Sequence, residues 1–236
     1  MHDALVISEV NPTRFHYSFN PYDPVQLLIS QTSLKNEKEF TNKVFLDRVE
    51  LCYRLTSNKN KTLVLRDHTH SDYFRMRDIN NITNFSSLID ILKVRFDLLS
   101  MLTVRQPLES YLSLHKFLKN IKTNLIVQDF DDYCARTILM IRHYKNLEVP
   151  IFKYEDFCAT PHDVMQRMCE KLELKYNKNF DKEFSKYLMT GDSGRASAGK
   201  IREIRVLPSK VPLEIKDMAK KSRNYQTLSN LLDYND

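Results

Sequence analysis

The sequence predicts an α/β fold in which a parallel sheet is flanked by helices. Short apolar runs that are typical of buried strands begin at Leu63, Leu98 and Val149. Segments with helical spacing of apolar residues separate these runs. Because a strand, a helix and a further strand in this order need a crossover connection, the strands are expected to be parallel, with helices on both faces of the sheet.

Helices are expected wherever apolar residues recur at intervals of three and four along the chain. The clearest case begins at Glu39, where Phe40, Val44 and Phe45 fall on one side of the predicted helix. We expect helices over residues 39–56, 86–95, 129–146, 162–174 and 213–232, and a further one that opens near Leu108.

A single domain over residues 1–236 accounts for the length and composition. The chain has 42% hydrophobic and 28% charged residues, which is enough apolar surface for one core. The cysteines form no CxxC pair, and this favours reduced thiols in a cytoplasmic protein. No apolar stretch approaches the roughly 20 residues of a membrane span, so we expect no membrane partner.

The segment after the second strand predicts a site for an anion. Arg105 directly follows the apolar run 98–104, and Pro107 pre-sets the φ angle for a helix that opens near Leu108. Open α/β sheets bind ligands at the carboxyl ends of their strands, and a helix start presents free N–H groups and positive dipole. Ser113 adds a hydroxyl. The alternative is an ordinary turn with a solvated arginine.

An arginine followed by a proline after two residues and a serine after eight, between strand and helix, resembles a sulfotransferase motif. Sulfotransferases use it to hold the 3′-phosphate of 3′-phosphoadenosine-5′-phosphosulfate, the sulfuryl donor. The resemblance implies that Arg105 and Ser113 contact this phosphate, with Ser110 as the alternative to Ser113. It also implies a P-loop-nucleotide-hydrolase-like fold and a reaction that needs no metal.

The resemblance assigns a catalytic role to His68. In the family, a strand of the kind that begins here at Leu63 ends in the histidine that takes the proton from an acceptor hydroxyl, and His68 matches this position. Imidazole suits the task because its ordinary pKa is about 6.5. If the strand continued, His68 and His70 would share one face, and this pair could instead bind a metal together with Asp67 or Asp72. A pair of surface histidines is the remaining alternative.

Two further segments match the family. Tyr-Glu-Asp at the end of the third strand resembles the family segment whose tyrosine lies near the adenine, which implies nucleotide binding by Tyr154. The segment 190–205 contains every glycine of the chain, interleaved with basic residues, and it looks like the loop that closes over the 3′-phosphate. Arg195 and Lys200 are the residues implied there. A core tyrosine and a solvated basic helix face are the respective alternatives.

The family also has a feature that this sequence lacks. Sulfotransferases open with a strand and a loop of glycine, serine and threonine that cradles the 5′-phosphosulfate, whereas the first glycine here is Gly191. We therefore expect a sulfotransferase-like domain that is N-terminally incomplete. It would transfer a sulfuryl group to an unidentified acceptor hydroxyl, or be inactive as this shortened chain.

Two other classes of function stay open. One is a non-catalytic nucleotide-binding or scaffold protein of the same fold. The other is a basic nucleic-acid-binding module, which the pI of about 9.0 allows. Residues 195–223 hold nine Lys or Arg against three acidic residues, a local excess equal to the whole net charge of +6. Because this charge follows the glycine segment and is not interleaved with aromatic residues, a polyanionic nucleotide is favoured over a nucleic acid.

Overall fold

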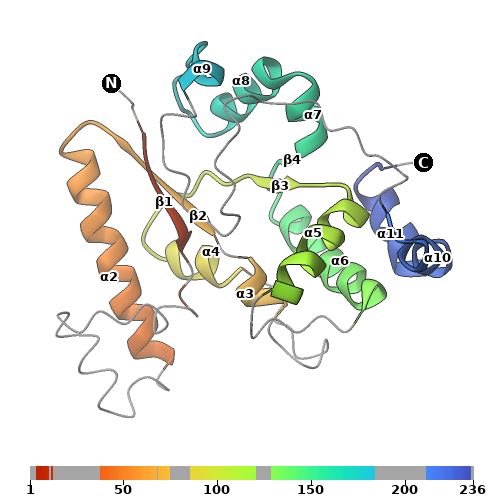
Figure 1. Cartoon of the computed structure of the whole chain (residues 1–236). Coiled ribbons are helices and arrows are strands. Elements are labelled where there is room, and N and C mark those ends of the chain that lie inside the picture. The colour runs from red at the N-terminus through yellow and green to blue at the C-terminus, as the bar shows by residue number, and fades with distance from the viewer. Residues whose placement is uncertain are drawn as a thin grey trace. The chain divides into compact units, whose positions relative to one another are not determined.

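A computed structural model describes residues 4–10, 12, 38–67, 69–74, 86–120, 129–183 and 211–234 (Figure 1). The described residues divide into two compact units. The first unit holds residues up to 72 together with 86–98, and the second holds 73–74, 99–183 and 211–234. The single domain predicted from the sequence stays a prediction.

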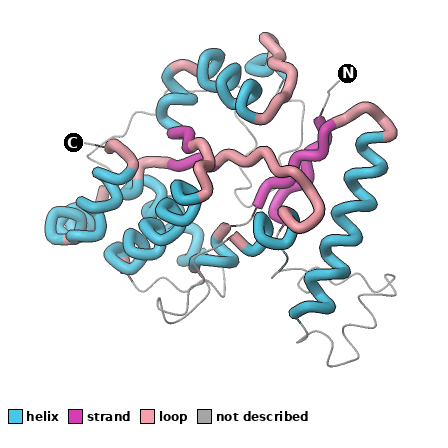
Figure 2. The backbone as a smooth tube through the Cα atoms, turned by 180° about the vertical axis from the view of Figure 1, so that it is seen from behind, coloured by secondary structure: helices cyan, strands magenta, loops and turns pink. Residues whose placement is uncertain are grey.

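The structure contains both helices and strands, as expected for an α/β fold (Figure 2). Both described strand pairs are parallel, as predicted. In the first unit, β1 (Ala4–Val10) pairs with β2 (Thr62–Asp67), and α2 (Lys38–Ser57) connects them along the chain. The short helices α3 (His70–Tyr73) and α4 (Ser87–Leu92) follow. The expected helix over 39–56 is therefore confirmed, whereas β1 is a strand that the sequence analysis did not predict.

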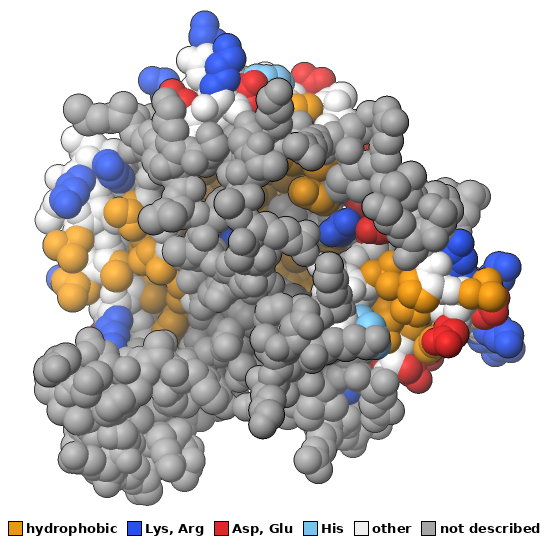
Figure 3. All heavy atoms as spheres, viewed as in Figure 1, with side chains coloured by type: hydrophobic (Ala, Val, Ile, Leu, Met, Phe, Trp, Pro, Cys, Tyr) orange, Lys and Arg blue, Asp and Glu red, His pale blue; other side chains and the backbone are white. Residues whose placement is uncertain are grey.

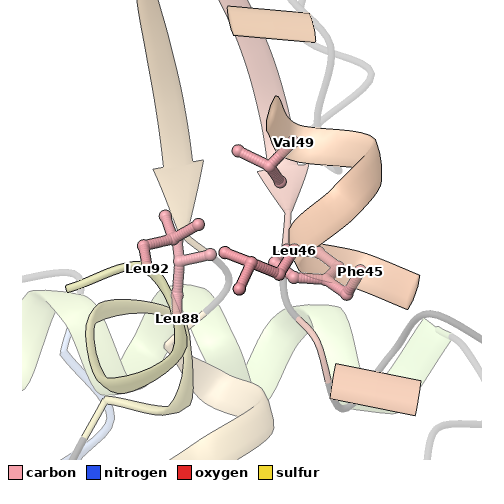
Figure 4. Close-up of a cluster of buried hydrophobic side chains, with 5 residues drawn as sticks. All are labelled: Phe45, Leu46, Val49, Leu88 and Leu92. Atoms are coloured by element: carbon pink, nitrogen blue, oxygen red, sulfur yellow. The ribbon is translucent and has the colours of Figure 1, made fainter. Parts of the chain in front are cut away.

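The core of the first unit lies between α2 and α4. Phe45, Leu46 and Val49 of α2 pack with Leu88 and Leu92 of α4, and all five side chains are buried (Figure 4). Partly buried leucines of β2 pack against this cluster. The spacing of one, three and four residues on α2 is the helical periodicity that predicted the element.

The first unit also leaves apolar side chains exposed. Figure 3 shows hydrophobic side chains on the surface over α2, and the exposed ones on this helix are Leu51, Tyr53 and Leu55. Among the described residues, no helix is both long enough and apolar enough to cross a membrane.

In the second unit, β3 (Leu102–Val104) pairs with β4 (Ile151–Lys153), with Leu102 opposite Ile151 and Val104 opposite Lys153. Between these strands the chain forms α5 (Pro107–Asn120) and α6 (Phe130–Asn146). After β4 come α7 (Tyr154–Ala159), α8 (Pro161–Lys171), α9 (Phe180–Glu183), α10 (Leu213–Lys221) and α11 (Arg223–Leu231).

Three of the expected elements differ in their bounds. The second strand begins at Leu102 rather than Leu98, because its ladder starts where the Leu102 N–H donates to the Pro150 carbonyl at 2.9 Å. The Tyr-Glu-Asp segment opens α7 instead of ending the strand. The expected helix over 213–232 is two helices, because Ser222 leaves helical geometry and its hydroxyl caps α11 by accepting from the Tyr225 N–H at 2.9 Å.

Candidate functional site

The parallel pairing of β3 with β4 brings two predicted site residues to one edge. Val104 and Lys153 are paired at the ends of the strands, and Arg105 and Tyr154 are the next residues of each chain segment. The carboxyl ends of parallel strands lie at the same edge of a sheet. There the Arg105 Cζ lies 5.6 Å from the centroid of the Tyr154 ring, within the range of a cation–π contact.

The turn between β3 and α5 is held by its own capping residue. The Gln106 Oε1 accepts from the Glu109 N–H at 2.9 Å, which caps the start of the helix. Pro107 occupies the first helical position, where its missing N–H costs no hydrogen bond. In addition, the Gln106 backbone N–H donates to the Glu155 Oε1 at 3.0 Å, so a side chain of α7 holds the residue that follows Arg105.

The Arg105 guanidinium is oriented by a carboxylate on the first turn of α5. Its Nη2 donates to the Glu109 Oε2 at 3.0 Å, and the two side chains are 29% and 20% exposed. The Arg105 Nε is buried and has no hydrogen-bond partner in the described part of the chain. The guanidinium therefore lies against an aromatic ring and is fixed on one side by a carboxylate.

The two serines of α5 have different surroundings. The Ser110 Oγ accepts a hydrogen bond from the hydroxyl of the buried Tyr133 at 2.8 Å. Burial raises the pKa of Tyr133 to about 12, so the phenol keeps its proton and remains a donor. Ser113 is partly buried and lies four residues after Glu109, on the same face of the helix as the carboxylate that holds Arg105.

Several predicted site residues lie outside the described residues: His68, Arg195 and Lys200. The carboxylates that were alternative metal ligands beside His70 are bonded to serines. The Asp72 Oδ1 accepts from the Ser87 hydroxyl at 2.6 Å, and the Asp67 Oδ2 accepts from the Ser86 hydroxyl at 3.2 Å. Within the described ranges, no group of three His, Cys, Asp or Glu residues is arranged to hold a metal ion.

Sequence reasoning did not find two residues that support the site: Gln106 and Glu109. The Gln-Pro-Leu-Glu run is typical of a helix start and could have revealed the capping role of Gln106. The contact from Glu155 has no local sequence signal, because 49 residues separate it from Gln106.

No protein-family model and no curated protein matches the chain. Two solved structures match the chain in a comparison of structures. One is a sulfotransferase domain from the curacin biosynthetic pathway, 12% identical over 96% of this chain and 87% of that chain, with a TM-score of 0.45. The other is a sulfotransferase domain from the Synechococcus PCC 7002 olefin synthase, 11% identical over 100% of this chain and 97% of that chain, with a TM-score of 0.42.

Proposed function

We propose that this chain is a sulfotransferase that binds the adenosine 3′,5′-bisphosphate part of 3′-phosphoadenosine-5′-phosphosulfate at the carboxyl edge of β3 and β4. One observation carries the proposal. Arg105 and Tyr154, which the sequence motifs relate separately to the 3′-phosphate and the adenine, lie in contact at this edge.

Each residue of the proposed site has a role that follows from its chemistry. Arg105 donates to the 3′-phosphate, since charge-assisted hydrogen bonds from a guanidinium are the strongest that a side chain offers to this group. Ser113 donates a further hydrogen bond from the same face of α5, whose N-terminal dipole also favours an anion. Tyr154 packs its ring against the adenine. Arg195 and Lys200 add positive charge over the phosphate.

The proposed reaction moves a sulfuryl group from the donor to an acceptor hydroxyl. His68 takes the proton of the hydroxyl, whose oxygen forms a bond to sulfur while the bond between sulfur and the 5′-phosphate oxygen breaks. The released product is adenosine 3′,5′-bisphosphate. The remaining contribution of the protein is orientation of the donor and neutralisation of its charge.

Calorimetry with adenosine 3′,5′-bisphosphate tests the binding site. We expect micromolar binding to the full chain and a loss of at least about tenfold in Arg105→Ala, as expected for a charge-assisted hydrogen bond. Arg95→Ala is the matched control, because the Arg95 guanidinium is also partly exposed and pairs with Asp47 and Glu50 in the first unit. This control is expected to bind like the unmodified chain.

Other outcomes favour the other classes of function. Equal binding by Arg105→Ala would contradict the nucleotide site. Salt-sensitive binding of any oligonucleotide that Arg105→Ala leaves unchanged would favour a nucleic-acid-binding module. Binding of the nucleotide without turnover of the donor, measured against a panel of hydroxyl acceptors, would favour a non-catalytic nucleotide-binding protein.

A further inference from the structure

The end of α11 and the residues that follow it are tied to α6 and to the end of β4, the strand that precedes the proposed site. The Lys145 Nζ donates to the Leu231 carbonyl at 2.7 Å, and the Lys153 Nζ donates to the Asp233 carbonyl at 2.8 Å. The Lys153 ammonium also lies 4.7 Å from the centroid of the Tyr234 ring. Lys153, the last residue of β4, therefore holds the segment after α11 against the end of this strand, while Lys145 of α6 holds the last residue of α11.

Tyr234 reaches the site through one carboxylate. Its hydroxyl donates to the Glu155 Oε2 at 2.6 Å, while the Glu155 Oε1 accepts from the Gln106 N–H at 3.0 Å. The two oxygens of Glu155 thus join Tyr234 to the backbone of the residue next to Arg105. Burial, followed by the hydrogen bond to Glu155, raises the pKa of Tyr234, so the phenol keeps the proton that it donates.

A second contact from the same part of the chain reaches Gln106. The Gln106 Nε2 donates to the hydroxyl of Tyr225 on α11 at 3.1 Å. The backbone N–H and the side chain of Gln106 are therefore both held, directly or through Glu155, by residues more than a hundred positions further along the chain.

We propose that Tyr234 is a positioning residue of the nucleotide site, because it holds Glu155 against the Arg105–Gln106 turn and so sets the position of the guanidinium. This inference rests on the proposed function, in which Arg105 binds the 3′-phosphate. Tyr234 itself does not contact the nucleotide in this proposal. Its removal should therefore weaken the contribution of the 3′-phosphate and leave the rest of the binding energy largely in place.

The test compares Tyr234→Phe with the unmodified chain by calorimetry, using adenosine 3′,5′-bisphosphate and 5′-AMP as probes. We expect the affinity for the bisphosphate to fall about fivefold and that for 5′-AMP to change less than about twofold, because one hydrogen bond in the support of the phosphate contact is lost. Hydrogen exchange at the Gln106 amide should become faster. A general loss of stability would weaken both probes alike.

Tyr176→Phe is the matched control. The Tyr176 hydroxyl lies 2.6 Å from the His162 Nδ1, so the variant removes one bonded hydroxyl away from the proposed site. We expect it to keep both affinities and the exchange rate at Gln106. Glu155→Ala provides a second variant, because it removes both oxygens that join the Tyr234 hydroxyl to the Gln106 N–H. Its effect should be at least as large as that of Tyr234→Phe, and combining the two variants should add little to the effect of Glu155→Ala.

The outcomes separate this inference from the proposed function. If the unmodified chain does not bind the bisphosphate, or Arg105→Ala binds it equally well, both are overturned. If Arg105→Ala loses binding but Tyr234→Phe and Glu155→Ala retain the affinity of the unmodified chain, only the positioning role is overturned. An equal loss for the two probes in Tyr234→Phe, or the same loss in Tyr176→Phe, also overturns it.

Discussion

Replacement of Glu109 by glutamine is expected to raise the affinity of the proposed site for adenosine 3′,5′-bisphosphate. The Glu109 carboxylate lies 3.0 Å from the Arg105 Nη2, on the guanidinium that the phosphate would also contact. Carboxylate and phosphate would therefore be neighbours of like charge. The amide of glutamine removes this repulsion and still accepts a hydrogen bond from Arg105.

The magnitude follows from the geometry of the pair. Two anions on one guanidinium are separated by roughly 5 Å, and we take an effective dielectric constant of about 40, between the roughly 20 of pairs near a protein surface and the roughly 80 of water. The repulsion is then about 1.5 kcal/mol for each phosphate charge, which corresponds to about a tenfold change in affinity. The stability of the chain should fall by only about 0.5 kcal/mol, since the lost ion pair links residues four apart at a helix start.

Calorimetry and chemical denaturation of Glu109→Gln measure the two quantities separately. Glu50→Gln is a suitable control, because it makes the same change beside Arg95 in the first unit. The control is expected to leave the affinity for the nucleotide unchanged. An unchanged or weaker affinity in Glu109→Gln would refute the competition and would indicate that the carboxylate serves only to orient Arg105.

Three other predictions concern the serines, the core and the cysteines. In calorimetry, Ser113→Ala should weaken nucleotide binding about fivefold at unchanged stability. In urea denaturation, Ser110→Ala should lower the free energy of unfolding by about 1 kcal/mol, because the hydroxyl of the buried Tyr133 loses its acceptor. Exchanged effects of the two variants would contradict these assignments. Leu88→Ala should lower the free energy of unfolding by about 2–4 kcal/mol, measured by chemical denaturation, because Leu88 is buried in the cluster of α2 and α4. The exposed Leu51→Ala should lower it by less than about 0.5 kcal/mol, and similar losses in the two variants would contradict this core. Cys134 is buried, and burial raises the pKa of its thiol, so mass spectrometry should find Cys134 alkylated only after the chain is unfolded. Rapid alkylation of Cys134 in the folded chain would contradict its burial.

The helices could be predicted because their signals are local. On α2 the apolar residues recur with the helical period, and α6 begins where the Asp129 side chain accepts from the Asp132 N–H at 2.9 Å. Pro107 likewise marked the start of α5. Each of these signals lies within a few residues of the element that it predicts, and so the sequence was sufficient to locate them.

The strands were harder to place because their bounds depend on a distant partner. The apolar run from Leu98 could have been paired along its whole length, but pairing with β4 begins only at Leu102. β1 became recognisable as a strand through its pairing with β2, which begins with Ala4 opposite Thr62. The residues of a short strand carry little information about the segment that will lie beside them.

The residues of the candidate site could be predicted from the sequence, whereas the contacts between them could not. Short motifs were sufficient to name Arg105, Ser113 and Tyr154, because the residues that form a turn between a strand and a helix are close together in the sequence. The contact of Arg105 with Tyr154 and the bond from Tyr234 to Glu155 could not, because they join residues that are far apart along the chain. Local spacing sets the conformation of a segment, whereas the pairing of β3 with β4 and the packing of α11 establish which side chains meet.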